Sequence, residues 1–255
     1  MKDYFKYIFM LAIVLFSFYY TDRVFEFSLN NNTILASINE YAQENDTKCI
    51  EGSINENGII LGLSGLKVNK NKSYSNMKGN GFKDELIEYE KEECILSKEN
   101  NLDKYIISGN NINKNISLVI DIVNQKYYEK MMEVFENNNI SYNLLVNDNF
   151  KNNEYETILY KGDNIKSFKK QYNNIYCVKT NDYEIINDCK KYKINSIRMI
   201  NYIDSKLYTN IKKLLNNGNI IFIKESNLNL NELEITIKYI TSRGFNIVDI
   251  NDLLS

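Results

Sequence analysis

The chain has 255 residues, of which 44% are hydrophobic and 25% are charged, and this composition is typical of a globular protein. A formal net charge of −2 argues against a nucleic-acid binder, because such proteins normally present a basic face. The sequence contains no histidine, which removes the commonest general base and the commonest metal ligand.

Residues 1–22 are expected to form a signal-anchor transmembrane helix. Lys2 and Lys6 precede an apolar run over residues 7–20, which has aromatic residues near both ends. No small-x-small cleavage pattern follows, so an uncleaved anchor is favoured over a cleaved signal peptide or a buried core helix. The positive-inside rule then predicts a single-pass protein of the cell membrane, with its body extracytoplasmic.

Residues 23–112 are expected to form a small α+β region. Asn31 or Asn32 is a candidate cap for a helix that ends near Asp46, and short strand-like pieces bounded by glycines follow it. Residues 69–82 are polar and contain glycine, which is typical of a loop. This region carries no motif that indicates a chemical activity.

Residues 113–255 form the main domain, and its first unit is a strand, a helix and a strand over residues 117–147. The run 117–123 is apolar almost throughout, as expected for a strand covered on both faces. Two strands joined by a helix within about 30 residues run parallel with a right-handed crossover. Asp121 lies near the carboxyl end of the first strand, where α/β folds place their chemistry.

The pattern of strand and helix then repeats to the end of the chain. Further strands are expected at residues 156–160, 175–178, 196–200, 219–223 and 245–248, with apolar helical stripes between them. About seven alternating strands predict a parallel sheet with helices outside it, either as a barrel or as a doubly wound sheet.

Two C-terminal segments, residues 217–223 and 240–254, resemble the end of the polysaccharide deacetylase family, the NodB-homology domain. In that family a glycine, a short apolar strand, a helix and a glycine–aromatic step precede a closing Leu-Leu turn, here Leu253-Leu254. Residues 117–146 resemble the family's first motif strand, its helix and its second strand. The resemblance covers residues 113–255 and implies a distorted (β/α) barrel of about seven strands.

The family removes acetyl groups from envelope polysaccharides by using a divalent metal such as zinc, held by an aspartate and two histidines. By this resemblance Asp121 matches the base aspartate, but Ile122 stands in place of the metal-binding aspartate. The metal histidines would fall near residues 160–163, and none exists there. Arg198 keeps the arginine of an Arg-Pro-Pro-Tyr motif, and Lys224 replaces the late acid histidine.

These losses predict a catalytically inactive protein with no metal or other cofactor, which binds cell-envelope polysaccharide or an envelope protein through the old cleft. Asp121 and Arg198 are expected to meet as a partly exposed ion pair, and Lys224 with Glu225 as a solvated strand end. One alternative is an active carbohydrate deacetylase that uses Asp121 and Lys224. The other is an unrelated α/β binding domain, which no glycine-rich phosphate loop supports.

Four cysteines, Cys49, Cys94, Cys177 and Cys189, permit disulfides if the body lies outside the membrane. Cys177 ends an expected strand and Cys189 lies on the face of the next helix, so these two are predicted either to bridge or to remain buried thiols. No short Cys-x-x-Cys spacing supports a metal site made of cysteines alone.

Overall fold

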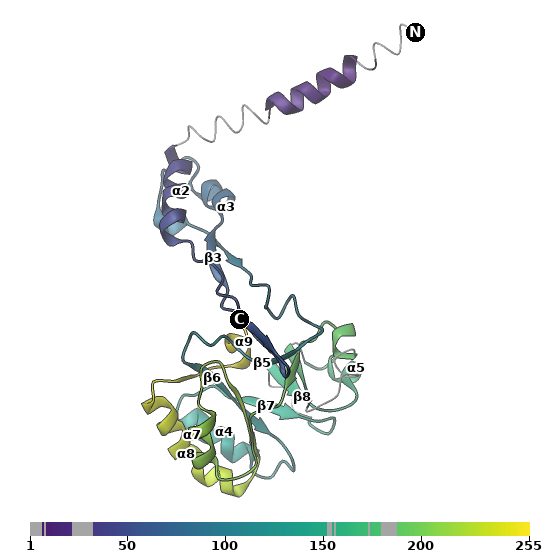
Figure 1. The fold of residues 1–255 in the computed structure, drawn as a ribbon, viewed down its shortest axis with the longest axis vertical. Coiled ribbons are helices and arrows are strands. Elements are labelled where there is room, and N and C mark those ends of the chain that lie inside the picture. The colour runs from purple at the N-terminus through teal and green to yellow at the C-terminus, as the bar shows by residue number, and fades with distance from the viewer. Residues whose placement is uncertain are drawn as a thin grey trace. The chain divides into compact units, whose positions relative to one another are not determined.

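The structure is a computed structural model that describes residues 7, 9–21, 33–151, 155, 157–172, 174–179 and 188–255. It divides into two compact units, each of which is described by itself (Figure 1). The first comprises residues 1–48 and 65–92, and the second comprises residues 49–64 and 93–255. The division differs from the expected boundary at residue 112, because residues 49–64 and 93–112 belong with the large domain.

Residues 9–21 are helical and their apolar side chains are exposed. Among the described residues, no helix is both long and apolar enough to cross a membrane. The expected anchor over residues 1–22 includes residues 1–6, 8 and 22, which lie outside the described part of the chain.

The rest of the first unit is a small α+β structure. It contains the helices α2 (Thr33–Asn45) and α3 (Lys70–Met77), a 3-10 turn at Asp84–Leu86, and the antiparallel strands β3 (Gly65–Val68) and β4 (Tyr89–Glu92). Asn69 caps α3, since its side chain accepts a hydrogen bond from the Lys72 backbone N–H. The residues predicted to be a loop over 69–82 therefore begin with a helix.

The second unit is built on an eleven-stranded sheet, in which the neighbouring strands follow the order β1-β2-β5-β10-β9-β8-β7-β6-β12-β11, and β13 pairs with β6. The bounds of these strands are β1 Ser53–Asn55, β2 Gly58–Ile60, β5 Tyr105–Ser108, β6 Asn115–Asp121, β7 Asn143–Val146, β8 Thr157–Tyr160, β9 Asn174–Lys179, β10 Ser196–Arg198, β11 Tyr202–Ile203, β12 Ile220–Lys224 and β13 Asn246–Ile247.

Seven strands of this sheet, from β5 through β10, β9, β8, β7 and β6 to β12, run parallel to one another. The sheet curls, because Ser108 at the end of β5 forms an antiparallel bridge with Asn219 directly before β12. The Gly109 N–H also donates to the Gly218 carbonyl at 2.9 Å. The expected mixed α/β fold with a curled parallel sheet is confirmed.

Both faces of the sheet are buried, which explains the continuous apolar runs in its strands. Leu118 and Ile120 of β6 belong to an outer apolar layer that includes residues of the helices α4 (Tyr128–Asn137), α7 (Leu207–Leu214) and α8 (Asn227–Ser242). Val119 belongs to an inner layer inside the curl, together with Phe222 and residues of the short helix α9 (Ile250–Leu253). Another short helix, α5, spans Ile165–Phe168.

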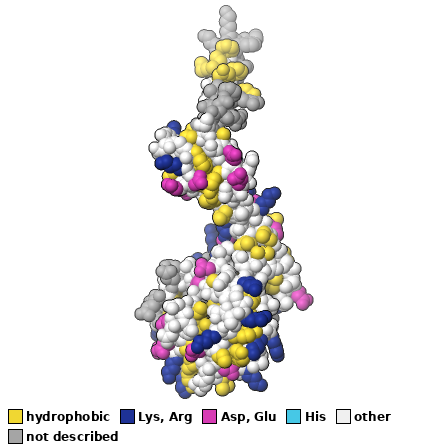
Figure 2. All heavy atoms as spheres, turned by 90° about the vertical axis from the view of Figure 1, so that its left-hand side faces the viewer, with side chains coloured by type: hydrophobic (Ala, Val, Ile, Leu, Met, Phe, Trp, Pro, Cys, Tyr) yellow, Lys and Arg dark blue, Asp and Glu magenta, His cyan; other side chains and the backbone are white. Residues whose placement is uncertain are grey.

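Acidic and basic side chains both lie on the face of the second unit that Figure 2 draws, interspersed with hydrophobic ones. A surface of mixed sign agrees with the net charge of −2.

Candidate functional site

Asp121 ends β6 at the carboxyl edge of the parallel sheet. Because successive side chains of a strand point to opposite faces, Asp121 shares the inner face with Val119, whereas Ile120 and Ile122 belong to the outer layer. Asp121 is only 4% exposed. A buried carboxylate is costly unless it is paired and hydrogen-bonded, so its partners define the chemistry of this edge.

Two side chains satisfy the Asp121 carboxylate, and they come from the strands that lie two places away from β6 on either side. Lys161, directly after β8, forms an ion pair with Oδ1. Tyr202 of β11 donates its hydroxyl to Oδ2 at 3.0 Å. Burial, and next the negative charge of Asp121, raise the pKa of Tyr202, so this hydroxyl remains a donor. A tethered cation and a neutral donor therefore occupy both carboxylate oxygens.

Arg198 does not pair with Asp121, contrary to the expectation from the sequence. Its guanidinium donates to the backbone carbonyls of Asn57 at 3.0 Å and Glu56 at 3.4 Å. The reason is the alternation along β10: Ile197 belongs to the inner layer, so its neighbour Arg198 points to the other face.

Lys224 lies opposite Asp121 in the register of β12 and β6, but it does not donate to that carboxylate. Its ammonium pairs with Asp204 at 2.5 Å, and the Asp204 side chain is 63% exposed. The structure thus brings Asp121 and Lys224 to one edge of the sheet while each of them binds a different partner.

Glu225 is the residue that the sequence interpretation placed incorrectly, as part of a solvated strand end. It is 2% exposed, and its carboxylate accepts four backbone N–H groups of the loop after β6, those of Val123, Asn124, Gln125 and Tyr127, at 2.5–3.0 Å. Burial alone would raise the pKa of Glu225, but the four donors outweigh it and lower that pKa. Glu225 therefore fixes the loop that follows Asp121.

The residues at this edge do not fit the divalent metal that the resemblance implies. Ile122 is 3% exposed and packs in the outer apolar layer, where it offers no ligand atom. Both oxygens of Asp121 are already bound to the Lys161 ammonium and the Tyr202 hydroxyl. In the segment expected to supply the histidines, the Tyr160 hydroxyl donates to the Asp148 carboxylate. A metal site needs several converging donors with free lone pairs, and these residues do not provide them.

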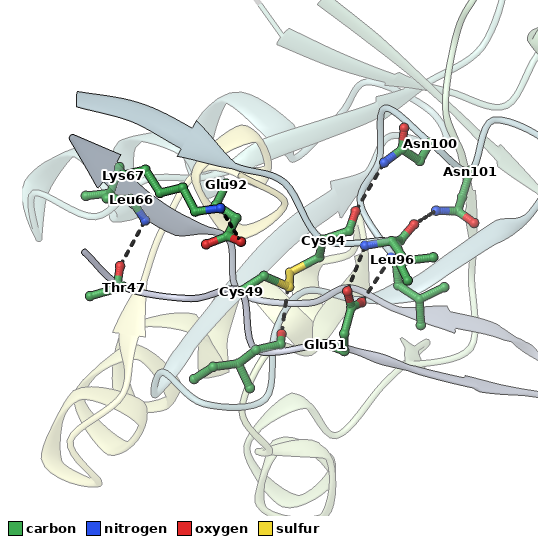
Figure 3. Close-up of a disulfide and its surroundings, with 12 residues drawn as sticks. Thr47, Cys49, Glu51, Leu66, Lys67, Glu92, Cys94, Leu96, Asn100 and Asn101 are labelled. Carbon is green, nitrogen blue, oxygen red and sulfur yellow. Dashed lines mark hydrogen bonds and ion pairs between the residues drawn. A yellow bond between two sulfur atoms is a disulfide. The ribbon is translucent and has the colours of Figure 1, made fainter. Parts of the chain in front are cut away.

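Among the described residues, one group of three metal-type ligands lies within 4.8 Å, and it consists of Cys49, Glu51 and Cys94. Its two sulfurs are joined in a disulfide (Figure 3), with Cα atoms 5.4 Å apart. The Glu51 carboxylate accepts the backbone N–H groups of Ile95 at 2.9 Å and Leu96 at 3.3 Å. This group therefore has a structural role.

Of the two alternatives left open for Cys177 and Cys189, the structure has the disulfide, with Cα atoms 6.5 Å apart. It links the end region of β9 to the helical residues that begin at 188, as the spacing of strand and helix indicated. All four cysteines are thus oxidised in pairs.

No protein-family model matches the chain, and no curated protein matches it. Solved structures do. BA3943, a CE4 family pseudoenzyme from Bacillus anthracis, is 12% identical with a TM-score of 0.60, covering 88% of this chain and 96% of that one. PdaA of Bacillus subtilis, a family 4 carbohydrate esterase, is 14% identical with a TM-score of 0.51, covering 61% of this chain and 86% of that one.

These similarities show that the chain has the fold of the family 4 carbohydrate esterases, in agreement with the resemblance seen in residues 113–255. The match to BA3943 covers more of the chain than the second unit alone contains, so the likeness reaches into the first unit. At such low identity the comparison concerns the fold, and the activity must be argued from the site.

Proposed function

We propose that this protein is a polysaccharide deacetylase-like pseudoenzyme, anchored in the cell membrane with its body outside, which binds envelope glycan at the edge of the sheet beside Asp121. One observation carries the proposal: the carboxylate at the catalytic end of β6 is neutralised by the protein's own Lys161. A carboxylate held by an ammonium and a hydroxyl is a poor base and a poor metal ligand. The edge thus retains its shape without the groups for hydrolysis.

The proposed location is supported by two features of the chain. Lys2 and Lys6 precede the apolar run of residues 7–20, as in a signal-anchor. All four cysteines form disulfides, which persist in oxidising compartments outside the cytoplasm. Labelling the intact cells with an impermeant lysine reagent tests this orientation, because a cytoplasmic body would remain unlabelled.

Glycan binding is supported by the side chains around Asp121. Tyr202 is 38% exposed and offers an aromatic ring for a sugar, while its hydroxyl is held by Asp121. Lys161 and Lys224 are partly exposed beside it and carry N–H groups that can donate to sugar hydroxyls or acyl oxygens. An envelope protein that binds the same side chains is the competing partner.

The test is a calorimetric titration of the full-length protein with acetylated chitooligosaccharides and cell-wall muropeptides. Binding should be saturable and should weaken about tenfold or more in Tyr202→Ala, because one ring stacked on a ligand contributes roughly 1–3 kcal/mol. Tyr89→Ala is the matched control, since Tyr89 is 44% exposed in the first unit. If both variants weakened glycan binding equally, the binding could not be assigned to the edge beside Asp121.

The same protein should release no acetate from these oligosaccharides, with or without added zinc. Zinc-dependent acetate release that Asp121→Asn abolishes would overturn the pseudoenzyme proposal in favour of an active deacetylase. A second outcome is that the protein binds no glycan and captures a defined envelope protein that Tyr202→Ala no longer binds. That result would show that the edge beside Asp121 binds a protein partner and not a glycan.

A further inference from the structure

A second site lies at the other edge of the parallel sheet. A cavity of about 260 Å³ opens beside Asn174, where β9 begins, and beside Asn195, which directly precedes β10. Because β9 and β10 are parallel, these positions share the amino edge of the sheet. Asp121 ends β6 at the carboxyl edge, so the cavity is separate from the proposed glycan site at that edge and does not depend on it.

Three lysines line this cavity: Lys98, Lys169 and Lys193. They come from three different parts of the chain, and the lining includes no carboxylate. The Lys169 ammonium donates to the Tyr192 carbonyl, which holds it beside the cavity while leaving it two further N–H groups. Among the described residues, neither Lys98 nor Lys193 has an acidic partner within 4.0 Å. The cavity therefore presents excess positive charge.

Carboxylates do lie near the cavity, but they do not neutralise it. Burial raises the pKa of Tyr176, a lining residue, and the charges of Asp249 and Glu99 add to that effect. The Asp249 carboxylate caps α9, where it accepts the Asn251 backbone N–H at 2.8 Å. Glu99 is exposed to solvent. Three lysines against these two carboxylates leave the neighbourhood positive.

The inner wall of the cavity is polar and held in place. The Tyr176 hydroxyl donates to the Asn251 side-chain oxygen at 2.9 Å, and the Asn251 amide donates to the Thr157 hydroxyl at 2.6 Å. Asn174 is exposed and also lines the cavity, and its side-chain amide offers both a donor and an acceptor for a hydroxyl group of a ligand.

From these groups we propose that the cavity binds a phosphomonoester carried on a small hydroxylated molecule, such as a sugar phosphate. The phosphate, with a charge of about −2 at neutral pH, matches the three lysines, and lysine is a common phosphate ligand. A sugar hydroxyl can hydrogen-bond the exposed amide of Asn174. The volume lies just below the usual range for sites of drug-sized ligands, which suits a single sugar unit.

The experiment titrates the full-length protein with glucose 6-phosphate, glucose, inorganic phosphate and glucuronic acid, by calorimetry at low ionic strength. Glucose 6-phosphate should bind saturably, and more tightly than the other three probes. The double variant Lys98→Gln/Lys193→Gln should weaken this binding at least tenfold. Lys190→Gln is the matched control, because Lys190 is an exposed lysine three positions from Lys193 that does not line the cavity.

If glucuronic acid bound more tightly than glucose 6-phosphate, the cavity would prefer a carboxylate to a phosphate, and the proposal would be overturned. Equal binding of inorganic phosphate and glucose 6-phosphate would also overturn it, because the sugar hydroxyls would then make no contact in the cavity. Equal affinity of the double variant and Lys190→Gln would show that the lysines of the cavity are not the ligands. Tyr202→Ala should leave the binding of glucose 6-phosphate unchanged, because Tyr202 lies beside Asp121 and does not line this cavity.

Discussion

Replacing Lys161 by methionine tests the assignment of the Asp121 edge most directly. The change keeps much of the side-chain volume and removes the ammonium that pairs with the Asp121 carboxylate. Removing one partner of a fully buried ion pair costs about 3–5 kcal/mol, because the other charge is left uncompensated. The Lys161 side chain is 26% exposed, and Tyr202 keeps its hydrogen bond to the carboxylate, so we expect a smaller loss of about 2–3 kcal/mol.

Lys224→Met is the matched control for this measurement. Lys224 also ends a strand at the same edge and also pairs with an aspartate, but the side chains of this pair are 37% and 63% exposed. An exposed ion pair contributes about 0–1 kcal/mol, so the control should lose at most that much. The double variant Asp121→Asn/Lys161→Met buries no charge and should lose less than the sum of its two single variants.

Urea unfolding followed by far-ultraviolet circular dichroism measures these free energies, since the chain contains no tryptophan for fluorescence. If Lys161→Met lost no more stability than Lys224→Met, the Lys161–Asp121 pair would not be the neutralising contact that the argument requires. Additive losses in the double variant would contradict a direct coupling of the two charges.

Three further predictions follow from the same unit. Glu225→Gln should lower the free energy of unfolding by about 2–3 kcal/mol at pH 7, because the hydrogen bonds to a charged carboxylate are lost, and urea unfolding measures this loss. Folding lowers the pKa of Glu225, so its carboxylate stabilises the fold fully above the unfolded pKa of about 4.3, and this stabilisation is lost as pH falls through the folded pKa. In Glu225→Gln the free energy of unfolding should therefore fall less steeply as pH decreases below about 4.3. The double variant Cys177→Ser/Cys189→Ser should lose up to about 3 kcal/mol of the free energy of unfolding, because the unfolded chain is no longer closed into a loop between two residues with a sequence separation of 12. An unchanged melting temperature would refute this. Ile122→Asp should destabilise by about 3–5 kcal/mol without creating zinc affinity in calorimetry, because it buries a charge in the outer apolar layer.

The main architecture was predictable because parallel strands covered on both faces leave a strong trace in the sequence. The run at 117–123 corresponds to β6, at Asn115–Asp121, whereas the spacing of strand and helix allowed the Cys177–Cys189 bridge without deciding between it and two buried thiols. The membership of β1 and β2 in the sheet was not predictable, since strands of three residues carry almost no periodicity and join the sheet only through the pairing of β2 with the distant β5.

The site was predictable only in part. Asp121 was identified from its place at the end of an apolar strand, which is a local property. Its partners Lys161 and Tyr202 are 40 and 81 residues away, and no sequence pattern links them to Asp121. Glu225 was misplaced for the same reason, because its backbone donors lie about 100 positions earlier in the chain. Acidic residues next to lysines at strand ends are usually solvated, and only the fold reveals the exception.

The bond between Cys49 and Cys94 closes a covalent ring around residues 49–94, and this ring includes the whole 65–92 part of the first unit. A protease that cuts once inside the ring, for example near Gly79 or Gly81, opens it without releasing a fragment. The two pieces separate on a gel only after a reductant is added. The first unit thus stays attached to the body of the protein after a nick that would detach an ordinary N-terminal domain.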